Sequence, residues 1–190
     1  MEIVLARHGE TEWSRDLKHT SRTDVPLTDR GREEAKLLGR ALAGRSFERI
    51  LSSPMQRALE TRRLAGVTGE VEITEDLLEW DYGEYEGITT AEIRRDRPDW
   101  YLWRDGCPGG ETAADVGRRV DRVIAELRGL EGDAVLFAHG HVLRVLTARW
   151  LGLGPESGAL FKLDTGTLST LGYERETPVI LRWNVPVSAA

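Results

Sequence analysis

The chain has 190 residues, 40% of them apolar and 31% charged, which is the composition of one folded domain with a substantial core. Its net charge of −6 argues against nucleic acid or an anionic membrane surface as the main partner. The single cysteine, Cys107, excludes an internal disulfide, and no segment has the pattern of a signal peptide or a membrane span. We therefore expect one cytoplasmic domain over residues 1–190.

The first half of the chain predicts two strands, each followed by a helix. An apolar strand at 3–6 precedes a helix that Thr28 caps, because a threonine side chain accepts hydrogen bonds from a first helical turn. A second strand at 49–51 precedes Ser53 and Pro54, the pattern of an N-cap and a first helical residue. The positions expected to face the core are Ala35, Leu38, Ala41 and Leu42 in the first helix, and Met55, Ala58 and Leu59 in the second.

Residues 75–110 differ in composition from the rest of the chain. They are rich in Asp, Glu, Arg, Gly and aromatic residues, and only 90–96 has a helical pattern. Loops carried on a rigid scaffold are where binding specificity commonly resides. We expect this segment to form a lid or cap over the sheet edge.

The second half continues the alternation of strands and helices. Apolar positions at helical spacing predict a helix at 111–128, and 134–138 is apolar throughout, as in a strand covered on both faces. A helix at about 142–151 follows, and loose alternation at 167–173 and 178–183 predicts a hairpin at a sheet edge. The chain is therefore expected to be an α/β domain.

Cationic and proton-carrying side chains follow three of these strands. Arg7 and His8 come directly after the first, Arg57 lies one helical turn beyond the second, and His139 and His141 follow the strand at 134–138. The carboxyl ends of strands in open α/β sheets bind ligands, and helix N-termini there favour phosphate. These residues predict a site for an oxyanion.

The residue types suit covalent phosphoryl transfer. A neutral histidine can attack phosphorus, and arginines keep it neutral while they bind the phosphoryl oxygens. The leaving oxygen needs a proton, which a nearby carboxylic acid supplies. Glu79 is the best candidate because its neighbours are apolar, but composition alone does not separate it from Asp81, Glu84 and Glu86.

Motifs of one known family occur in order along nearly the whole chain. They are Arg7-His8-Gly9-Glu10-Thr11 within 5–13, then 24–28 with Gly31, 52–61, Glu79 to Gly87, Gly110-Glu111-Thr112 and His139-Gly140. Together they resemble the histidine phosphatase superfamily, the phosphoglycerate-mutase-like proteins.

This resemblance implies both a fold and a set of roles. The fold is a three-layer α/β/α sandwich with a mostly parallel central sheet and an antiparallel edge. His8 is implied as the nucleophile and Glu79 as the proton donor. Arg7, Arg57 and His139 with Gly140 are implied as the phosphate pocket, without a metal or another cofactor.

Two positions depart from the family pattern. Ser14 stands where the family often has Asn, and Ser21 stands where it often has Gly. Both remain candidate substrate-binding residues, and the shape of that wall of the pocket is left open.

Further segments resemble a narrower branch of the family, which includes actinobacterial acid phosphatases and fungal sedoheptulose-1,7-bisphosphatases. They are Glu79–Gly87 with Thr89-Thr90, then 103–107, and 138–141. Mutases of the family carry a longer insertion after the proton-donor segment. Only 31 residues separate Glu79 from Glu111 here, which favours a phosphatase.

The roles of two further candidates stay open. His141 lines the pocket, caps the following helix or sits at the rim. Its spacing from His139 is that of a metal pair, but two arginines oppose a bound cation, so no metal is expected. Arg104 either reaches a second anionic group of the substrate or only pairs with Asp105.

The expected function is therefore that of a phosphomonoesterase. It hydrolyses a small phosphorylated metabolite, such as a sugar phosphate or bisphosphate, through a phosphohistidine. One alternative is a phosphoglycerate mutase, and another is a non-catalytic module that binds a phosphorylated ligand. The expected partner is a small-molecule phosphate ester, and the assembly state stays open, a homodimer included.

Overall fold

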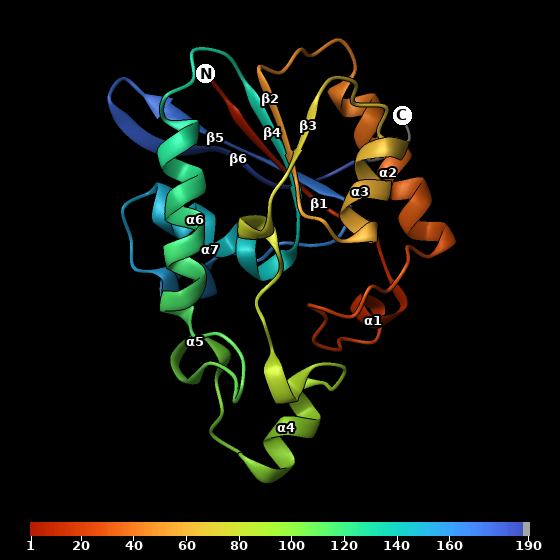
Figure 1. Cartoon of the computed structure of the whole chain (residues 1–190), viewed down its shortest axis with the longest axis vertical. Coiled ribbons are helices and arrows are strands. Elements are labelled where there is room, and N and C mark those ends of the chain that lie inside the picture. The colour runs from red at the N-terminus through yellow and green to blue at the C-terminus, as the bar shows by residue number, and fades with distance from the viewer. Residues whose placement is uncertain (188–190) are drawn as a thin grey trace.

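A single six-stranded sheet forms the centre of the molecule (Figure 1). The computed structural model describes residues 1–187. The strand order is β3-β2-β4-β1-β5-β6; the first four strands are parallel, and β5 and β6 form an antiparallel edge. The strands are β1 (Ile3–Arg7), β2 (Arg49–Ser52), β3 (Val71–Ile73), β4 (Ala134–Ala138), β5 (Thr167–Glu174) and β6 (Thr177–Pro186).

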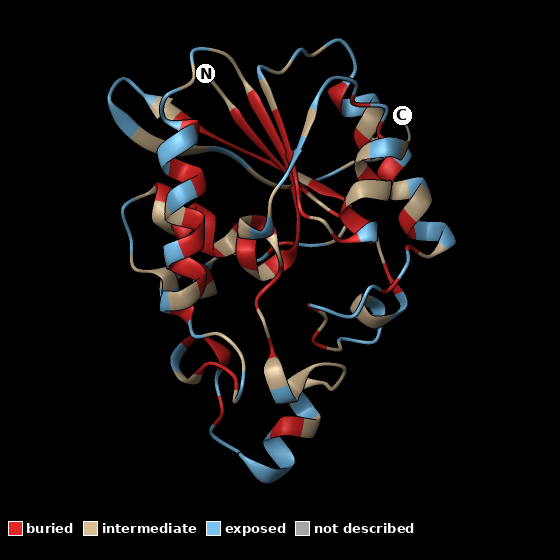
Figure 2. Ribbon diagram, in the orientation of Figure 1, coloured by how far each residue is buried: buried red, intermediate tan, exposed pale blue. Residues whose placement is uncertain are grey.

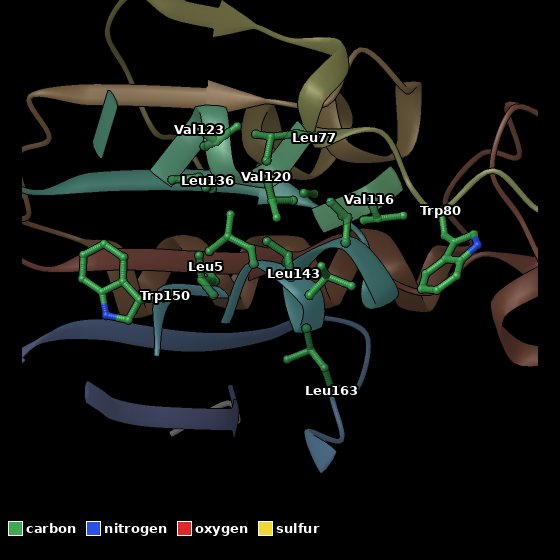
Figure 3. Close-up of a cluster of buried hydrophobic side chains, with 14 of the residues drawn as sticks. Leu5, Leu77, Trp80, Val116, Val120, Val123, Leu136, Leu143, Trp150 and Leu163 are labelled. Carbon is green, nitrogen blue, oxygen red and sulfur yellow. The ribbon is translucent and has the colours of Figure 1, made fainter. Parts of the chain in front are cut away.

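Helices cover both faces of this sheet. Alternate residues of β1 point to opposite sides: Ile3 and Leu5 pack with helices α6 and α7, and Val4 and Ala6 pack with α2 (Figures 2 and 3). The expected three-layer α/β/α fold is therefore confirmed. The helices are α1 (Glu12–Arg15), α2 (Asp29–Leu42), α3 (Gln56–Leu64), α4 (Thr90–Asp96), α5 (Leu102–Asp105), α6 (Ala113–Leu127) and α7 (Gly140–Trp150), with 3-10 turns η1 (Glu75–Leu77), η2 (Gly83–Tyr85) and η3 (Pro155–Leu160).

Three parallel strands end at one level. Arg7 pairs with Ala138, and Ser52 pairs with Phe137. The segment 75–110 lies beyond this edge, below the sheet in Figure 1, and buries Trp80, Tyr82, Trp100 and Trp103. Side chains that follow β1, β2 and β4 therefore meet between the sheet edge and this segment.

Most expected elements are confirmed, and the differences are local. The helix expected from Pro54 begins at Gln56, because the Ser53 hydroxyl contacts His139 instead of capping a helix. The helix expected from about residue 142 begins at Gly140. The expected inward positions are wrong for Ala41, which is exposed, and Leu59 is only half-buried. The short edge strand β3 had no counterpart among the expected elements.

Candidate active site

His8 follows β1 and is 5% exposed. Its Nδ1 lies 2.7 Å from the carbonyl oxygen of Gly9. A carbonyl only accepts hydrogen bonds, so Nδ1 carries the ring proton and Nε2 keeps its lone pair. Burial holds the pKa of His8 well below 6.5, and the positive charges of Arg57 and Arg7 lower it further. His8 is thus a neutral imidazole whose basic Nε2 has no hydrogen-bond partner among residues 1–187.

His139 lies beside His8 at the end of β4, with 5.1 Å between the ring centroids. The Nε of Arg57 donates to its Nδ1 over 3.1 Å, so its proton resides on Nε2, which donates to the Ser53 hydroxyl over 2.7 Å. Burial, Arg57 and His8 hold the pKa of His139 well below 6.5. Both of its ring nitrogens are therefore engaged, in contrast to those of His8.

Arg57 is fully buried in α3 and joins two parts of the site. Besides His139, its guanidinium donates to the carbonyl oxygens of Thr23 at 3.1 Å and Ser21 at 2.9 Å. Burial lowers its pKa from 12.5, while the charge of Glu79 opposes that shift. Arg57 thus fixes the loop after α1 against the carboxyl end of β4.

Arg7 places a second guanidinium at the N-terminus of α7. One of its Nη atoms donates to the carbonyl oxygen of Leu163, and its buried Nε has no partner among residues 1–187. A Cβ at Gly140 would lie 3.2 Å from Arg7 Cζ, so a glycine lets the guanidinium approach the helix closely. An unpaired guanidinium donor at a helix N-terminus is suited to an anion.

Glu79 is 6% exposed and lies against the first turn of α7. Its Oε1 accepts from the backbone N–H groups of Trp80 and Val142, both at 2.9 Å, and its Oε2 accepts from that of His141 at 3.0 Å. The carboxylate therefore lies at the N-terminus of the helix that follows His139.

The three rival acids occupy other places. Asp81 pairs with Arg22, Glu84 is exposed, and the Glu86 carboxylate accepts from the backbone N–H groups of Ser21 and Thr23. Of the four acids, Glu79 is the one held against α7.

His141 belongs to an aromatic wall next to Glu79. Its Nδ1 lies 2.7 Å from the hydroxyl of Tyr82, and its ring lies 5.4 Å from that of Trp103. Burial, Arg144 and His19 hold the pKa of His141 well below 6.5, and burial with the Glu79 charge raises the pKa of Tyr82 well above 10. His141 is neutral, and its backbone N–H also belongs to the first turn of α7.

Of the remaining candidate residues, only one contacts the cluster formed by His8, His139, Arg57, Arg7 and Glu79. Ser21 is buried, and its hydroxyl donates to the carbonyl oxygen of Glu79 at 3.2 Å. The Ser14 hydroxyl instead donates to the Thr11 carbonyl oxygen and accepts from the Thr11 N–H, both at 2.9 Å. Arg104 is exposed and pairs with Asp105 at 2.7 Å. The roles of Ser14 and Arg104 in substrate binding stay predictions without a contact to the cluster.

Ser53, Tyr82 and Arg144 were missed as site residues. Ser53 and Tyr82 lie inside motifs that were recognised for other residues. Arg144 follows Gly140 by one helical turn, the spacing that singles out Arg57 after β2.

Arg144 stacks on Trp103 at 4.6 Å and donates to the carbonyl oxygen of Gly158 at 3.0 Å. Within residues 1–187 Arg144 forms no ion pair with a carboxylate, and burial lowers its pKa from 12.5.

Residues 1–187 lack two features. No helix there is long and apolar enough to cross a membrane. No three His, Cys, Asp or Glu side chains there are grouped as ligands of a metal ion.

Comparison with known proteins relates nearly the whole chain to one family. The model of the histidine phosphatase superfamily (branch 1) matches residues 3–186. An acid phosphatase of Mycobacterium tuberculosis is 43% identical over 176 residues, 90% of this chain and 86% of that protein. A sedoheptulose 1,7-bisphosphatase of Saccharomyces cerevisiae is 38% identical over 184 residues, 80% of this chain and 68% of that protein. A solved structure of an open reading frame product from Mycobacterium tuberculosis superposes with a TM-score of 0.93 at 38% identity, covering 98% of both chains.

Proposed function

The chain belongs to the histidine phosphatase superfamily (branch 1), and we propose on this premise how it hydrolyses phosphate esters. In this proposal His8 carries the phosphoryl group, and Glu79 supplies a proton to the leaving oxygen. The observation that supports these roles most strongly is the state of His8. It is neutral, its Nε2 is free, and two arginines that can bind phosphoryl oxygens surround it.

The proposed reaction has two steps. In the first, the Nε2 lone pair forms a bond to phosphorus, the bond from phosphorus to the leaving oxygen breaks, and Glu79 transfers its proton to that oxygen. In the second, water attacks phosphorus while Glu79 takes a proton from it, and the phosphorus–nitrogen bond breaks to restore neutral His8. Arg7 and Arg57 stabilise the charge on the phosphoryl oxygens in both steps.

A third arginine, besides Arg7 and Arg57, bears on the nature of the substrate. Arg144 lies beside His141 and Trp103, without a carboxylate partner among the described residues, whereas the guanidinium of Arg104 is already paired with Asp105. A partly buried, uncompensated arginine is suited to a second anionic group. The S. cerevisiae relative is named for a substrate with two phosphates. We propose that this chain acts on a small phosphate ester that carries a second acidic group.

The first experiment measures hydrolysis of p-nitrophenyl phosphate by the wild type and by His8→Ala, with and without EDTA. We expect activity in the wild type, none in His8→Ala, and no effect of the chelator. Brief reaction followed by alkaline quenching should trap an acid-labile phosphohistidine in the wild type alone. Turnover by His8→Ala at the wild-type rate would remove His8 from the reaction.

A second experiment tests the acidic substrate group. Arg144→Met should raise KM for a sugar bisphosphate at least about tenfold and leave KM for p-nitrophenyl phosphate within about twofold. Arg149→Met is the matched control, because Arg149 lies on the same helix and pairs with Asp121. If Arg104→Met raises KM for the bisphosphate and Arg144→Met does not, the second anion lies at Arg104.

A further inference from the structure

Arg119 of α6 is buried and contacts the main chain that carries Glu79. Its guanidinium donates to the carbonyl oxygens of Asp76 at 2.9 Å, Leu78 at 2.6 Å and Glu79 at 3.1 Å. Its remaining N–H groups donate to the two carboxylate oxygens of Glu111, at 2.9 and 3.1 Å. All five donors of this arginine are therefore used within 76–79 and on Glu111.

Glu111 in turn contacts the residues that follow Glu79 in the chain. Its Oε2 accepts from the backbone N–H of Asp81 at 2.8 Å, and its own N–H donates to the Asp81 carbonyl oxygen at 2.8 Å. Its carbonyl oxygen accepts from the indole N–H of Trp80 at 3.0 Å. The Arg119–Glu111 ion pair thus holds the chain before and after Glu79.

This support replaces regular secondary structure. Residues 78–82 belong to neither a helix nor a strand, so the buried carbonyl groups there have no ladder partner of their own. Helix α6 also packs on η1, where Leu77 lies near Val120 and Val123 in Figure 3. The Glu79 backbone is therefore held from α6, and its carboxylate is held from α7.

We infer that the Arg119–Glu111 pair positions Glu79 for proton transfer, an inference that rests on the donor role proposed above. The pair touches neither His8 nor the arginines of the phosphate pocket. Loosening the pair moves the Glu79 carboxylate relative to the leaving oxygen and leaves phosphate binding in place. The effect should therefore depend on the leaving group, because a poor leaving group needs the proton and p-nitrophenolate does not.

The experiment compares Arg119→Met and Arg119→Lys on two substrates, an alkyl phosphate such as glycerol 3-phosphate and p-nitrophenyl phosphate. We expect kcat/KM for the alkyl phosphate, which reports phosphoryl transfer to His8 alone, to fall at least about tenfold in Arg119→Met, with kcat/KM for the aryl phosphate and inhibition by inorganic phosphate within about threefold of wild type. Arg119→Lys keeps the buried charge and should recover part of the loss. Arg122→Met is the matched control, since Arg122 is exposed on the same helix and pairs with the Asp76 carboxylate at 3.0 Å.

The outcomes separate this inference from the role of Glu79 itself. Equal losses of kcat/KM on both substrates, in Arg119→Met or in the milder Arg119→Lys, would mean that Arg119 only supports the fold and would overturn the inference. Unchanged kcat/KM for the alkyl phosphate in both variants would overturn it as well. Glu79→Gln tests the donor: if this variant hydrolyses the alkyl phosphate at the wild-type rate, the donor role itself fails.

Discussion

The two adjacent histidines differ in which ring nitrogen is free. The Nδ1 of His8 donates to the carbonyl oxygen of the next residue, Gly9, and its Nε2 has no partner among residues 1–187. In His139 the Nδ1 accepts from Arg57 and the Nε2 donates to the Ser53 hydroxyl. Sequence reasoning could place both at strand ends but could not distinguish their tautomers, because each tautomer depends on partners that lie far away along the chain. The hydrogen bonds therefore favour His8 as the nucleophile and leave His139 to orient Arg57.

Gly140 offers a direct test of the Arg7 site. In Gly140→Ala the new Cβ would lie 3.2 Å from Cζ and 3.4 Å from Nε of Arg7, so the guanidinium must move by a few tenths of an ångström. We expect KM for p-nitrophenyl phosphate and the inhibition constant of inorganic phosphate to rise together by about three- to tenfold. Steady-state kinetics of the purified variant measures both.

Gly129→Ala is the control for that substitution. Its Cβ would meet the Glu126 carbonyl oxygen at 3.5 Å, an ordinary contact away from the site, so its kinetics should match the wild type. A Gly140→Ala enzyme with unchanged phosphate affinity would show that Arg7 does not bind the phosphoryl group in this position.

At the scale of the elements, Glu79 does for α7 what an N-cap side chain does for other helices. The N-cap residue His139 makes no side-chain cap hydrogen bond, and the Glu79 carboxylate accepts from the second and third helical N–H groups instead. Negative charge at a helix N-terminus adds to the stabilisation. The carboxylate proposed as the proton donor is thus also a structural cap.

This double role predicts a large stability cost. Glu79→Ala leaves three buried N–H groups without an acceptor and should lower the free energy of unfolding by about 3 kcal/mol, while Glu79→Gln keeps one acceptor oxygen and should cost about 1 kcal/mol. Urea unfolding monitored by tryptophan fluorescence measures both values. Asp115→Ala, which removes the exposed capping box of α6, is the reference at about 1 kcal/mol. Equal costs for the alanine variants would contradict a buried cap.

The elements that the sequence predicted best are those with strong local patterns. The all-apolar run at 134–138 and the valine stripe of α6 identified β4 and α6, and Thr28 was identified as the cap of α2. The two errors at helix starts, in α3 and α7, occur where a side chain serves the site. Ser53 has the local chemistry of an N-cap but bonds His139, and the start of α7 was missed because its capping carboxylate comes from residue 79, a contact no local pattern contains.

At the scale of the whole molecule, the four histidines of the chain all have a lowered pKa. His8, His19, His139 and His141 have pKa values below 6.5, with burial as the largest cause for each. The unfolded chain binds protons at these positions below about pH 6.5, and the folded chain does not. Stability is therefore full above about pH 6.5 and is lost as the pH falls toward the lower pKa values of the folded state.

The expected loss between about pH 6.5 and 5.5 is about 1 kcal/mol for each histidine that stays neutral in the fold. Urea unfolding at about pH 7.5, 6.5 and 5.5 measures it, and the loss should shrink when inorganic phosphate is added, because a bound anion favours the protonated rings. His19→Asn is the matched variant, because the His19 ring lies 4.7 Å from that of Tyr82, outside the phosphate pocket. Its removal should make the loss in free energy of unfolding smaller by the contribution of one histidine. A free energy of unfolding that stays constant over this range would mean that the histidines take up protons at the same pH in the folded and the unfolded chain. Burial would then not keep His8 neutral below about pH 6.5.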